Sequence, residues 1–395
     1  MFNYTSTPEI QADADRFAEV ARRLEVVSTL PRTWSGRVRR DLQAEAIGAS
    51  VALEGVPVTV DDVRRILAGD QPRRVSDEDA SLVRGYREAM EFVLSRADDP
   101  SFVWSAEIFR TVHASVMARS YAAKAGLYRD RQVWLTNSIS GEQVYLPPPN
   151  EDVPTLVDEL AAWLAGPGQD LPALVRSALA HVWLAAVHPF RDGNGRTARI
   201  VSSLVMYRSG YRLPQFTSLE EWWGAHSADY YAAFECLGKS WNPRVDVTPF
   251  VSAHASAQRR QADALSLRQA TERLLWAALE DIVVHELRMD PRAANALWDA
   301  FFGREITNRY YRGVADVPQV TASHDLKQLQ TSGLLAPEGA GRSRAYTGTI
   351  ELLRRVVRLF SLAVETTGDG PVNADLRNAT IAALAAKAAG TTALG

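Results

Sequence analysis

A nine-residue polar segment, residues 188–196, interrupts two helical patterns and constrains the fold more than any other feature of the sequence. It reads His-Pro-Phe-Arg-Asp-Gly-Asn-Gly-Arg. Apolar residues at helical spacing occupy 174–187 and run directly into this segment, and another helical pattern begins after Gly195. Glycine adopts the backbone conformations that close tight turns. The sequence therefore predicts two helices that are joined by a short polar turn.

The residues of this turn suit a phosphate group. Gly193 and Gly195 let backbone N–H groups converge on an anion without obstruction by a Cβ atom, and the positive end of the following helix points to the same place. Arg196 and Arg199 are three residues apart, so they share a helix face and offer forked donors to phosphate oxygens. Asp192 is a hard oxygen ligand of the kind that Mg²⁺ takes together with substrate phosphates.

His188 lies at the other end of the turn. An imidazole with a pKa near neutrality can accept the proton of a hydroxyl that attacks phosphorus. A His-Pro pair or an Asp-Gly-Asn-Gly string is usually structural when it occurs alone. Here a base, a metal ligand, an anion site and two phosphate-binding arginines fall within twelve residues, and packing alone does not explain that combination.

Residues 188–196 resemble the signature of the Fic domain family, His-Pro-Phe-x-Asp/Glu-Gly-Asn-Gly-Arg, at every specified position, and the resemblance extends over about residues 35–255. It implies a mostly α-helical fold: a helical Fic-type core with a small β-hairpin flap. It also implies an enzyme, a protein adenylyltransferase. A Ser, Thr or Tyr hydroxyl of a protein would attack the α-phosphate of ATP, and pyrophosphate would leave while Mg²⁺ neutralises the developing charge.

The resemblance also implies a role for each residue of the turn. His188 would be the catalytic base, Phe190 a buried anchor of the loop and Asp192 the Mg²⁺ ligand. Gly193, Asn194 and Gly195 would form an anion hole for the nucleotide phosphates. Arg196 and Arg199 would bind the same phosphates.

An upstream segment predicts a built-in inhibitor. Residues 50–55, Ser-Val-Ala-Leu-Glu-Gly, end a helical pattern and are similar to the inhibitory motif Ser/Thr-x-x-x-Glu-Gly/Asn of many Fic proteins. Ser50, Glu54 and Gly55 would be the specified residues of that motif. The resemblance implies that Glu54 pairs with Arg199 and withholds that arginine from the γ-phosphate, so low basal activity is expected. In some family members the same glutamate also supports removal of AMP, and the sequence leaves this second activity open.

Two further segments agree with the resemblance. Apolar runs flank a polar, turn-forming stretch between Gly126 and Pro149, which predicts a β-hairpin. The hairpin, at about residues 133–146, resembles the family's flap, whose edge would hold a target protein by strand addition. The chain itself is another candidate target, through self-modification or as a homo-oligomer. Trp222, Tyr230 and Tyr231 resemble the region that closes around the nucleotide base, although aromatic residues at helical spacing more often pack in a core.

The C-terminal part resembles a small winged helix-turn-helix domain, with a recognition helix at about 320–329 and a glycine-rich wing near 338–342. Between residues 304 and 344, six basic residues (Arg304, Arg309, Arg312, Lys327, Arg342 and Arg344) oppose four acidic ones (Glu305, Asp316, Asp325 and Glu338). This mild excess leaves DNA binding through 291–350 and protein contact both open. The expected regions are 1–97 (helical, with an inhibitory helix at about 35–55), 98–255 (catalytic core), 256–290 (connecting helices), 291–350 (winged helix) and 351–395 (helical tail).

Composition narrows the remaining possibilities. The 395 residues carry a net charge of −3, which gives no general attraction for nucleic acid or an anionic membrane. Cys236 is the only cysteine, so no intrachain disulfide can form and a reducing compartment is expected. The sequence has no basic-apolar leader and no run of 18 apolar residues, which predicts a cytoplasmic protein without a membrane partner.

Three alternatives remain open at this point. The same loop could transfer UMP, phosphate or phosphocholine, although Gly195 argues against the phosphate-transferring relatives, in which lysine typically precedes the arginine. A second class is a DNA-binding transcriptional regulator that uses the Fic pocket as a nucleotide sensor. Zinc hydrolysis is the weakest alternative, because His181 and His188 could share a helix face but no third ligand is evident.

Overall fold

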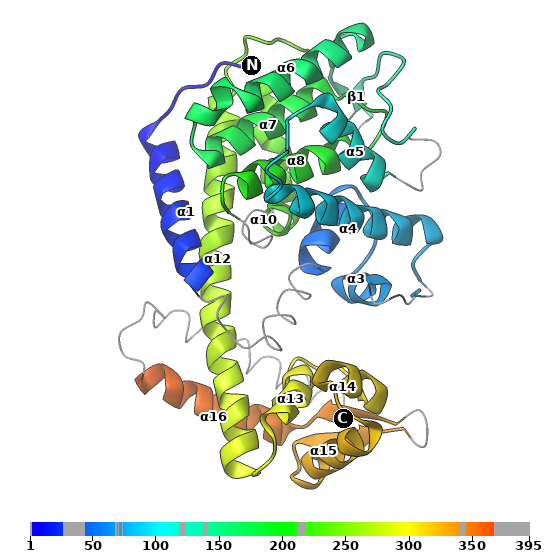
Figure 1. Cartoon of the computed structure of the whole chain (residues 1–395), viewed down its shortest axis with the longest axis vertical. Helices are drawn as coiled ribbons and strands as arrows, with labels where there is room; N and C mark the ends of the chain where they lie inside the picture. Colours follow the sequence, from blue (N-terminus) through cyan, green and yellow to red (C-terminus); the bar gives the residue numbers. More distant parts are fainter. Residues whose placement is uncertain are drawn as a thin grey trace. The chain divides into compact units, whose positions relative to one another are not determined.

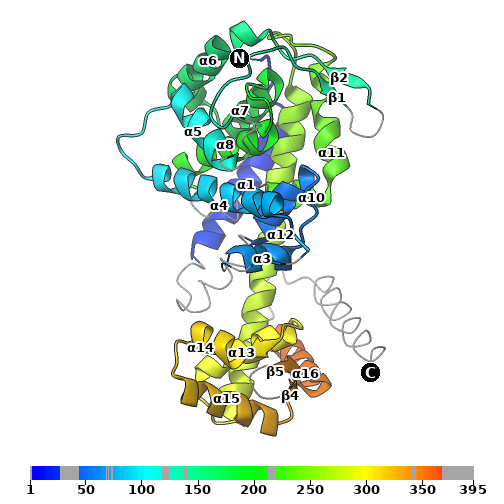
Figure 2. The same ribbon diagram turned by 90° about the vertical axis from the view of Figure 1, so that its right-hand side faces the viewer.

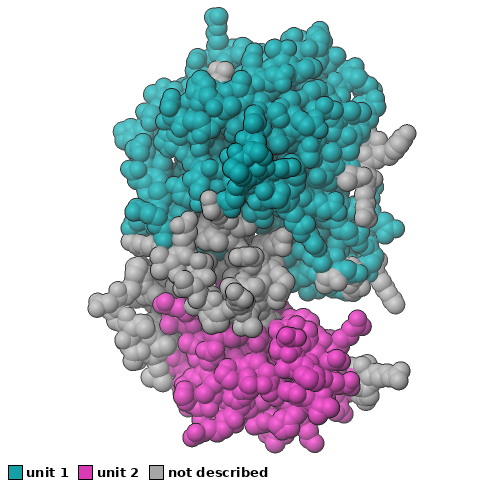
Figure 3. All heavy atoms as spheres, in the orientation of Figure 1, with its two compact units in different colours: residues 1–265 teal, residues 266–395 magenta. Residues whose placement is uncertain are grey.

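The computed structural model describes residues 2–26, 44–67, 69, 71–72, 74–117, 124–136, 141–211, 219–339 and 344–366. The chain divides into two compact units, residues 1–265 and 266–395, which are coloured teal and magenta in Figure 3. Each unit has its own apolar core.

The described part of the first unit is mostly helical, as predicted (Figure 1). None of the described helices of the chain is both long enough and apolar enough to cross a membrane. The helices are α1 (Pro8–Val26), a segment at 44–53, α3 (Val60–Leu67), α4 (Asp77–Ala97), α5 (Ala106–Val116), α6 (Val153–Ala165), α7 (Ala173–Val187), α8 (Asn194–Arg208), α10 (Glu220–Ala225), α11 (Ser227–Ala232) and the first part of α12 (Thr248–Asp281). Short 3₁₀ turns are η2 (Asn150–Asp152), η3 (Pro167–Asp170) and η4 (Ala233–Leu237).

Helices α7 and α8 form the centre of this unit. Almost every residue of both helices is buried, including polar ones, which is typical of helices that are covered on all sides. Helices α4, α5 and α7 pack directly on α8, and they lie beside it in both Figure 1 and Figure 2. The turn between α7 and α8 is therefore fixed by two helices that the core holds rigidly.

The predicted hairpin is present, but its described strands are short. Strand β1 (Leu135–Thr136) pairs antiparallel with β2 (Gln143–Tyr145), with Leu135 opposite Tyr145 and Thr136 opposite Gln143. The pairing register shifts between Leu135 and Thr136. Residues 137–140 of the predicted flap lie outside the described residues.

The second unit combines helices with a three-stranded antiparallel sheet in the order β3-β5-β4, of which Figure 2 labels β4 and β5. Its core also draws on residues outside the predicted range 291–350, such as Leu279 and Ile282 before it and Leu352 and Val356 after it. After α12 its elements are the π-helical η5 (Ile282–Glu286), η6 (Pro291–Ala293), α13 (Ala294–Phe301), β3 (Ile306–Thr307), α14 (Asn308–Ala315), α15 (Gln319–Thr331), β4 (Leu335–Glu338), β5 (Ala345–Gly348) and α16 (Ile350–Thr366).

The winged-helix assignment of this unit stays a prediction. Helix α15 lies where the recognition helix is expected, and β4 and β5 follow it. Arg342 and the rest of 340–343, in the expected wing, lie outside the described residues, as does 367–395 of the expected tail. Arg309, Arg312 and Lys327 are exposed, but Glu305 and Asp316 are exposed as well, so the described surface does not add to the case for DNA.

Candidate active site

Two residues in the left-handed region of backbone conformation shape the turn between α7 and α8. His188 ends α7 with φ 51° and ψ 58°, and Gly193 begins α8 with φ 74° and ψ 10°. A left-handed conformation is easy for glycine but uncommon for other residues. A Cβ atom on Gly193 would also lie 2.7 Å from the sulfur of Met117. Position 193 therefore favours glycine, chiefly for its conformation.

The side chain of Asn194 closes the turn on itself. Its Oδ1 accepts a hydrogen bond from the backbone N–H of Phe190 (2.9 Å), and its Nδ2 donates to the carbonyl oxygen of the same residue (3.0 Å). Phe190 is fully buried beneath the turn, as expected for an anchor. Because both polar atoms of the Asn194 amide are used within the loop, its contribution to an anion hole would come from its backbone N–H rather than from its side chain.

His113 of α5 supports the turn from below. Its ring stacks on Phe190 with centroids 3.7 Å apart and planes 2° from parallel. The backbone N–H of Gly126 donates to Nδ1 (2.8 Å), so Nε2 carries the proton and donates to the carbonyl oxygen of Asp192 (2.9 Å). Burial lowers the pKa of His113 to about 4, which keeps it neutral. A single histidine in an apolar helix gives no motif, so sequence reasoning missed this contact.

Arg129 ties the turn to the segment that carries the flap. Its backbone N–H donates to the carbonyl oxygen of Pro189 (2.9 Å), and its Nε donates to that of His188 (3.0 Å). Its Nη2 donates to the carbonyl oxygen of Pro148, just beyond the hairpin. The sequence alone does not reveal this connection.

His188 is held in the state that a base needs. Burial, together with the charge of Arg129, lowers its pKa to about 4, although a hydrogen bond to Ala185 and the charges of Glu54 and Asp192 act in the opposite direction. Its Nδ1 lies 3.4 Å from the carbonyl oxygen of Ala185, which makes Nδ1 the donor and leaves the lone pair on Nε2. At neutral pH the ring is uncharged and able to accept a proton.

Arg196 has the properties of an anion ligand. Its side chain is only 3% exposed, its Nη2 is 3.6 Å from Asp192 Oδ1, and its Nε and Nη1 have no hydrogen-bond partner among the described residues. A buried guanidinium with unused donors is unfavourable unless an anion binds to it. Arg196 and the N-terminus of α8 therefore form a site that is suited to phosphate.

Asp192 fits the expected magnesium ligand. Its side chain is 62% exposed, and its Oδ1 accepts the backbone N–H of Gly193 (2.6 Å). The described residues contain no group of three or more His, Cys, Asp or Glu side chains that could hold a metal ion by itself. Mg²⁺ is usually held by one or two carboxylates together with substrate phosphates, and Asp192 beside the anion site supplies one such carboxylate.

The structure places Glu54 directly against Arg199. Arg199 Nη2 donates to Glu54 Oε1 (2.8 Å) and to the carbonyl oxygen of Ser50 (3.2 Å), while its Nε donates to Ser50 Oγ (3.2 Å). The side chains of Arg199 and Glu54 are 1% and 25% exposed. A Cβ atom on Gly195 would lie only 2.7 Å from Glu54 Oε1, so glycine at this position lets the carboxylate reach the start of α8. Gly55, with φ 80°, follows directly.

Glu54 stays charged in this position. Burial acts to raise its pKa, but the charges of Arg199 and Arg196 outweigh burial and lower the pKa overall. The carboxylate therefore occupies, as an anion, the region that the sequence predicts for nucleotide phosphate.

The aromatic residues after α8 differ in their surroundings. Trp222 stacks on His226 (4.0 Å, 13°), and Tyr231 is 57% exposed and donates its hydroxyl to the carbonyl oxygen of Leu53 (2.8 Å). Tyr230 is only 4% exposed and packs against Trp223. It therefore belongs to the core, the more common role of aromatic residues at helical spacing, and does not offer a free ring face to a base.

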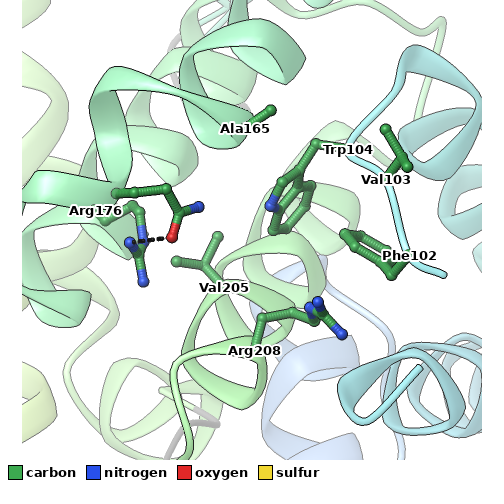
Figure 4. Close-up of a pocket in the computed structure, with 8 residues that line it drawn as sticks. Phe102, Val103, Trp104, Ala165, Arg176, Val205 and Arg208 are labelled. Atoms are coloured by element: carbon green, nitrogen blue, oxygen red, sulfur yellow. Dashed lines mark hydrogen bonds between the residues drawn. The ribbon is translucent and has the colours of Figure 1, made fainter. Parts of the chain in front are cut away.

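A cavity of about 300 Å³ lies at the opposite end of α8 (Figure 4). Its lining includes Val205 and Arg208, roughly 17–21 Å along the helix from Asn194. Arg176 donates to the side chain of Gln169 (3.0 Å), and Arg208 donates to carbonyl oxygens at the end of α4. Both arginines have structural partners, so this cavity does not compete with the turn as the candidate phosphate site.

Buried neutral histidines predict that this unit loses stability in mild acid. His113 and His254 are fully buried, and burial lowers their pKa values to about 4 and about 3. The unfolded chain, with histidine pKa near 6.5, binds more protons below that pH, so the free energy of unfolding falls as pH drops from about 6.5 towards 4. We expect a loss of about 1 kcal/mol per histidine between pH 6.5 and 5.5, visible as a lower melting temperature.

The control for this prediction is His324, whose side chain is 75% exposed. Replacing His254 with Gln should flatten the pH dependence of the melting temperature between pH 6.5 and 5.5, whereas replacing His324 with Gln should not change it. Equal slopes for the parent chain and the His254→Gln variant would contradict the role given to burial.

Comparison with known proteins agrees with the geometry of the turn. Residues 103–206 match the Fic/DOC family. The chain is similar to the protein adenylyltransferase Fic of Nematostella vectensis, with 27% identity over 231 residues, 58% of this chain and 50% of that protein. It is also similar to the protein adenylyltransferase fic-1 of Caenorhabditis elegans, with 29% identity over 234 residues, 56% of this chain and 42% of that protein. The chain thus spans about half the length of the curated relatives it matches.

Solved structures show the same fold. A Fic family protein from Desulfovibrio desulfuricans aligns with a TM-score of 0.58 and 22% identity, covering 88% of this chain and 98% of that one. Fic-1 from Caenorhabditis elegans aligns with a TM-score of 0.53 and 25% identity, covering 66% of this chain and 74% of that one. The solved structures thus share the fold, and the match of the sequence identifies residues 103–206 as a Fic/DOC family domain.

Proposed function

We propose that this chain is a protein adenylyltransferase, which transfers AMP from ATP to a Ser, Thr or Tyr hydroxyl of a protein. The observation that carries the proposal is the pairing, on one turn, of neutral His188 with the buried and unsatisfied donors of Arg196. The first is a proton acceptor and the second is an anion ligand, as attack of a hydroxyl on a phosphate of ATP requires. The names of the relatives in Nematostella vectensis and Caenorhabditis elegans support the same reaction.

The reaction follows from these groups. The hydroxyl oxygen of the target forms a bond to the α-phosphorus of ATP, the bond to the bridging oxygen breaks, and pyrophosphate leaves with the electron pair. His188 Nε2 takes the hydroxyl proton, while backbone N–H groups at the start of α8 and the guanidinium groups of Arg196 and Arg199 stabilise the phosphate charge. When it is bound, Mg²⁺ supplies neutralising charge to the phosphates, and Asp192 is the residue that would hold it.

Glu54 acts as an inhibitor in this proposal. Its carboxylate pairs with Arg199 Nη2 and lies against Gly195 at the start of α8, so a γ-phosphate and Glu54 compete for the same donor. Ser50 fixes the remaining geometry through two further hydrogen bonds to Arg199. Basal transfer is therefore low, and it rises when Glu54 is withdrawn. Glu54 could also support removal of AMP from a modified protein, and the Glu54→Gly variant tests that second activity separately.

The hairpin is the proposed docking site for the target protein. Trp134 and Val144 are large apolar residues of the hairpin with 48% and 44% of their surface exposed. Such residues beside a strand edge favour an extended peptide, which would pair with the strand through its backbone. Arg129 connects the segment just after this hairpin to His188, which supports a docking site close to the base.

Differently labelled nucleotides test the reaction. The Glu54→Gly variant, incubated with a cell extract, is expected to transfer label from ATP labelled at the α-phosphate and none from ATP labelled at the γ-phosphate. Unlabelled ATP should compete with the transfer better than UTP. Label from the γ-phosphate would indicate phosphate transfer, and preferential use of UTP would indicate transfer of UMP. Either result would overturn the proposal.

A further inference from the structure

We propose that Tyr230 is a positioning residue, which holds Arg199 in place both when Glu54 is bound to it and when Glu54 has withdrawn. The inference rests on the proposed function, because it assigns Arg199 to the γ-phosphate of ATP. It adds a residue to that site whose hydroxyl touches neither the nucleotide nor the attacking hydroxyl and acts through Arg199.

The partners of Arg199 come from two different places. Ser50 and Glu54 bind its Nε and Nη2 atoms, and both belong to the inhibitory segment. Its Nη1 donates to the hydroxyl of Tyr230 on α11 (3.2 Å). Among the described residues, Tyr230 is thus the hydrogen-bond partner of Arg199 that lies outside the inhibitory segment. The Tyr230 ring also faces the guanidinium, whose central carbon is 5.7 Å from the ring centroid.

Tyr230 is itself held in a fixed orientation. It is 4% exposed, and its hydroxyl lies 3.3 Å from Nε2 of His181, which is fully buried. A guanidinium can only donate, so the Tyr230 oxygen accepts from Arg199, and its own proton points to His181 Nε2. Burial, with the charges of His254 and Arg199, lowers the pKa of His181, so the ring is neutral, and its tautomer with the proton on Nδ1 leaves Nε2 as the acceptor for Tyr230. The result is a continuous chain of hydrogen bonds from His181 through Tyr230 to Arg199.

This series of hydrogen bonds leaves the two terminal nitrogens of the Arg199 guanidinium with different partners. Tyr230 fixes Nη1, so Nη2 keeps pointing to the place that Glu54 now occupies. When Glu54 withdraws, Nη2 becomes available to a phosphate oxygen without reorientation of the side chain. An arginine that is already oriented loses less conformational entropy when it binds its ligand. Tyr230 therefore maintains the released enzyme, whereas Ser50 and Glu54 maintain the inhibited one.

The test uses Tyr230→Phe, which keeps the ring and its packing and removes only the hydroxyl. Nucleotide binding is measured by calorimetry in the Glu54→Gly, His188→Ala background, so that ATP is bound but not consumed. We expect Tyr230→Phe to weaken ATP binding roughly tenfold, equivalent to about 1.4 kcal/mol, and to leave ADP binding unchanged, since ADP has no γ-phosphate. His181→Phe, which removes the acceptor of the Tyr230 proton, should also weaken ATP binding but not ADP binding, by less than tenfold.

The matched control is Tyr207→Phe, which removes another buried tyrosine hydroxyl, on α8, and should not change the ratio of ATP to ADP affinity. Melting temperatures of all variants separate loss of folding from loss of positioning. If the background variant prefers ATP and Tyr230→Phe and His181→Phe keep that preference, the positioning role is overturned while the proposed function stands. If the background variant does not prefer ATP to ADP, and Glu54→Gly transfers no AMP, the proposed function fails and this inference fails with it.

Discussion

Replacing His188 with Ala is expected to abolish AMP transfer by the released enzyme, lowering the rate by about 10²–10⁴-fold. His188 holds an unprotonated Nε2 at neutral pH, because burial lowers its pKa to about 4, and no water molecule in the same place would be an equally good base. The measurement is the initial rate of label transfer from α-labelled ATP by Glu54→Gly with and without His188→Ala. A rate reduced by less than tenfold would show that another group takes the proton.

The control for this variant is nucleotide binding. His188 contributes its backbone carbonyl to Arg129, and substitution with Ala leaves that hydrogen bond intact. ATP affinity should therefore change little while transfer is lost. A parallel loss of ATP affinity would indicate that the substitution disturbs the turn rather than the chemistry.

Replacing Glu54 with Gly is expected to raise AMP transfer by about 10–100-fold, the range that corresponds to loss of one competing hydrogen bond between charged groups. The ion pair with Arg199 is largely buried, and the carboxylate lies against the start of α8, where phosphate would bind. Residue 54 follows the helical segment 44–53, so glycine there does not interrupt a helix. The variant should also bind ATP more tightly than the parent chain.

Glu45 offers a matched control for the loss of a carboxylate from the same segment. It pairs with Arg64 at 3.5 Å and is 20% exposed, close to the exposure of Glu54. Glu45→Ala should therefore leave the rate of AMP transfer close to that of the parent chain. Equal rates for the parent and Glu54→Gly, or equal activation by Glu45→Ala, would contradict a specific inhibitory role of Glu54.

The parts of the site that are local in sequence could be predicted from it. The turn between two helices follows from the glycines and the flanking apolar patterns, and the hairpin follows from the apolar runs around 137–141. Phe190 is buried as expected. The contact of Glu54 with Arg199 joins residues 145 positions apart, and it was expected only through the resemblance of two short motifs to a family.

The parts that depend on packing between distant helices could not be predicted. His113 supports the turn only because α5 packs on α8, and its sequence surroundings are apolar and unremarkable. Asn194 was expected to line an anion hole, but its side chain bonds to Phe190 within the loop. Tyr230 was grouped with base-binding aromatics, yet the arrangement of α7, α8 and α11 buries it beside Arg199. Helical periodicity indicates that a residue is buried, but it does not indicate which polar atom that residue forms a hydrogen bond with.

Mass spectrometry of proteins from a cell extract treated with ATP and the Glu54→Gly variant tests the central claim most directly. The account predicts peptides in which a Ser, Thr or Tyr side chain carries one AMP group, and it predicts that these peptides are absent when His188→Ala is added to the same variant. Modification by phosphate or another nucleotide, no modification, or AMP addition that persists without His188 would contradict it.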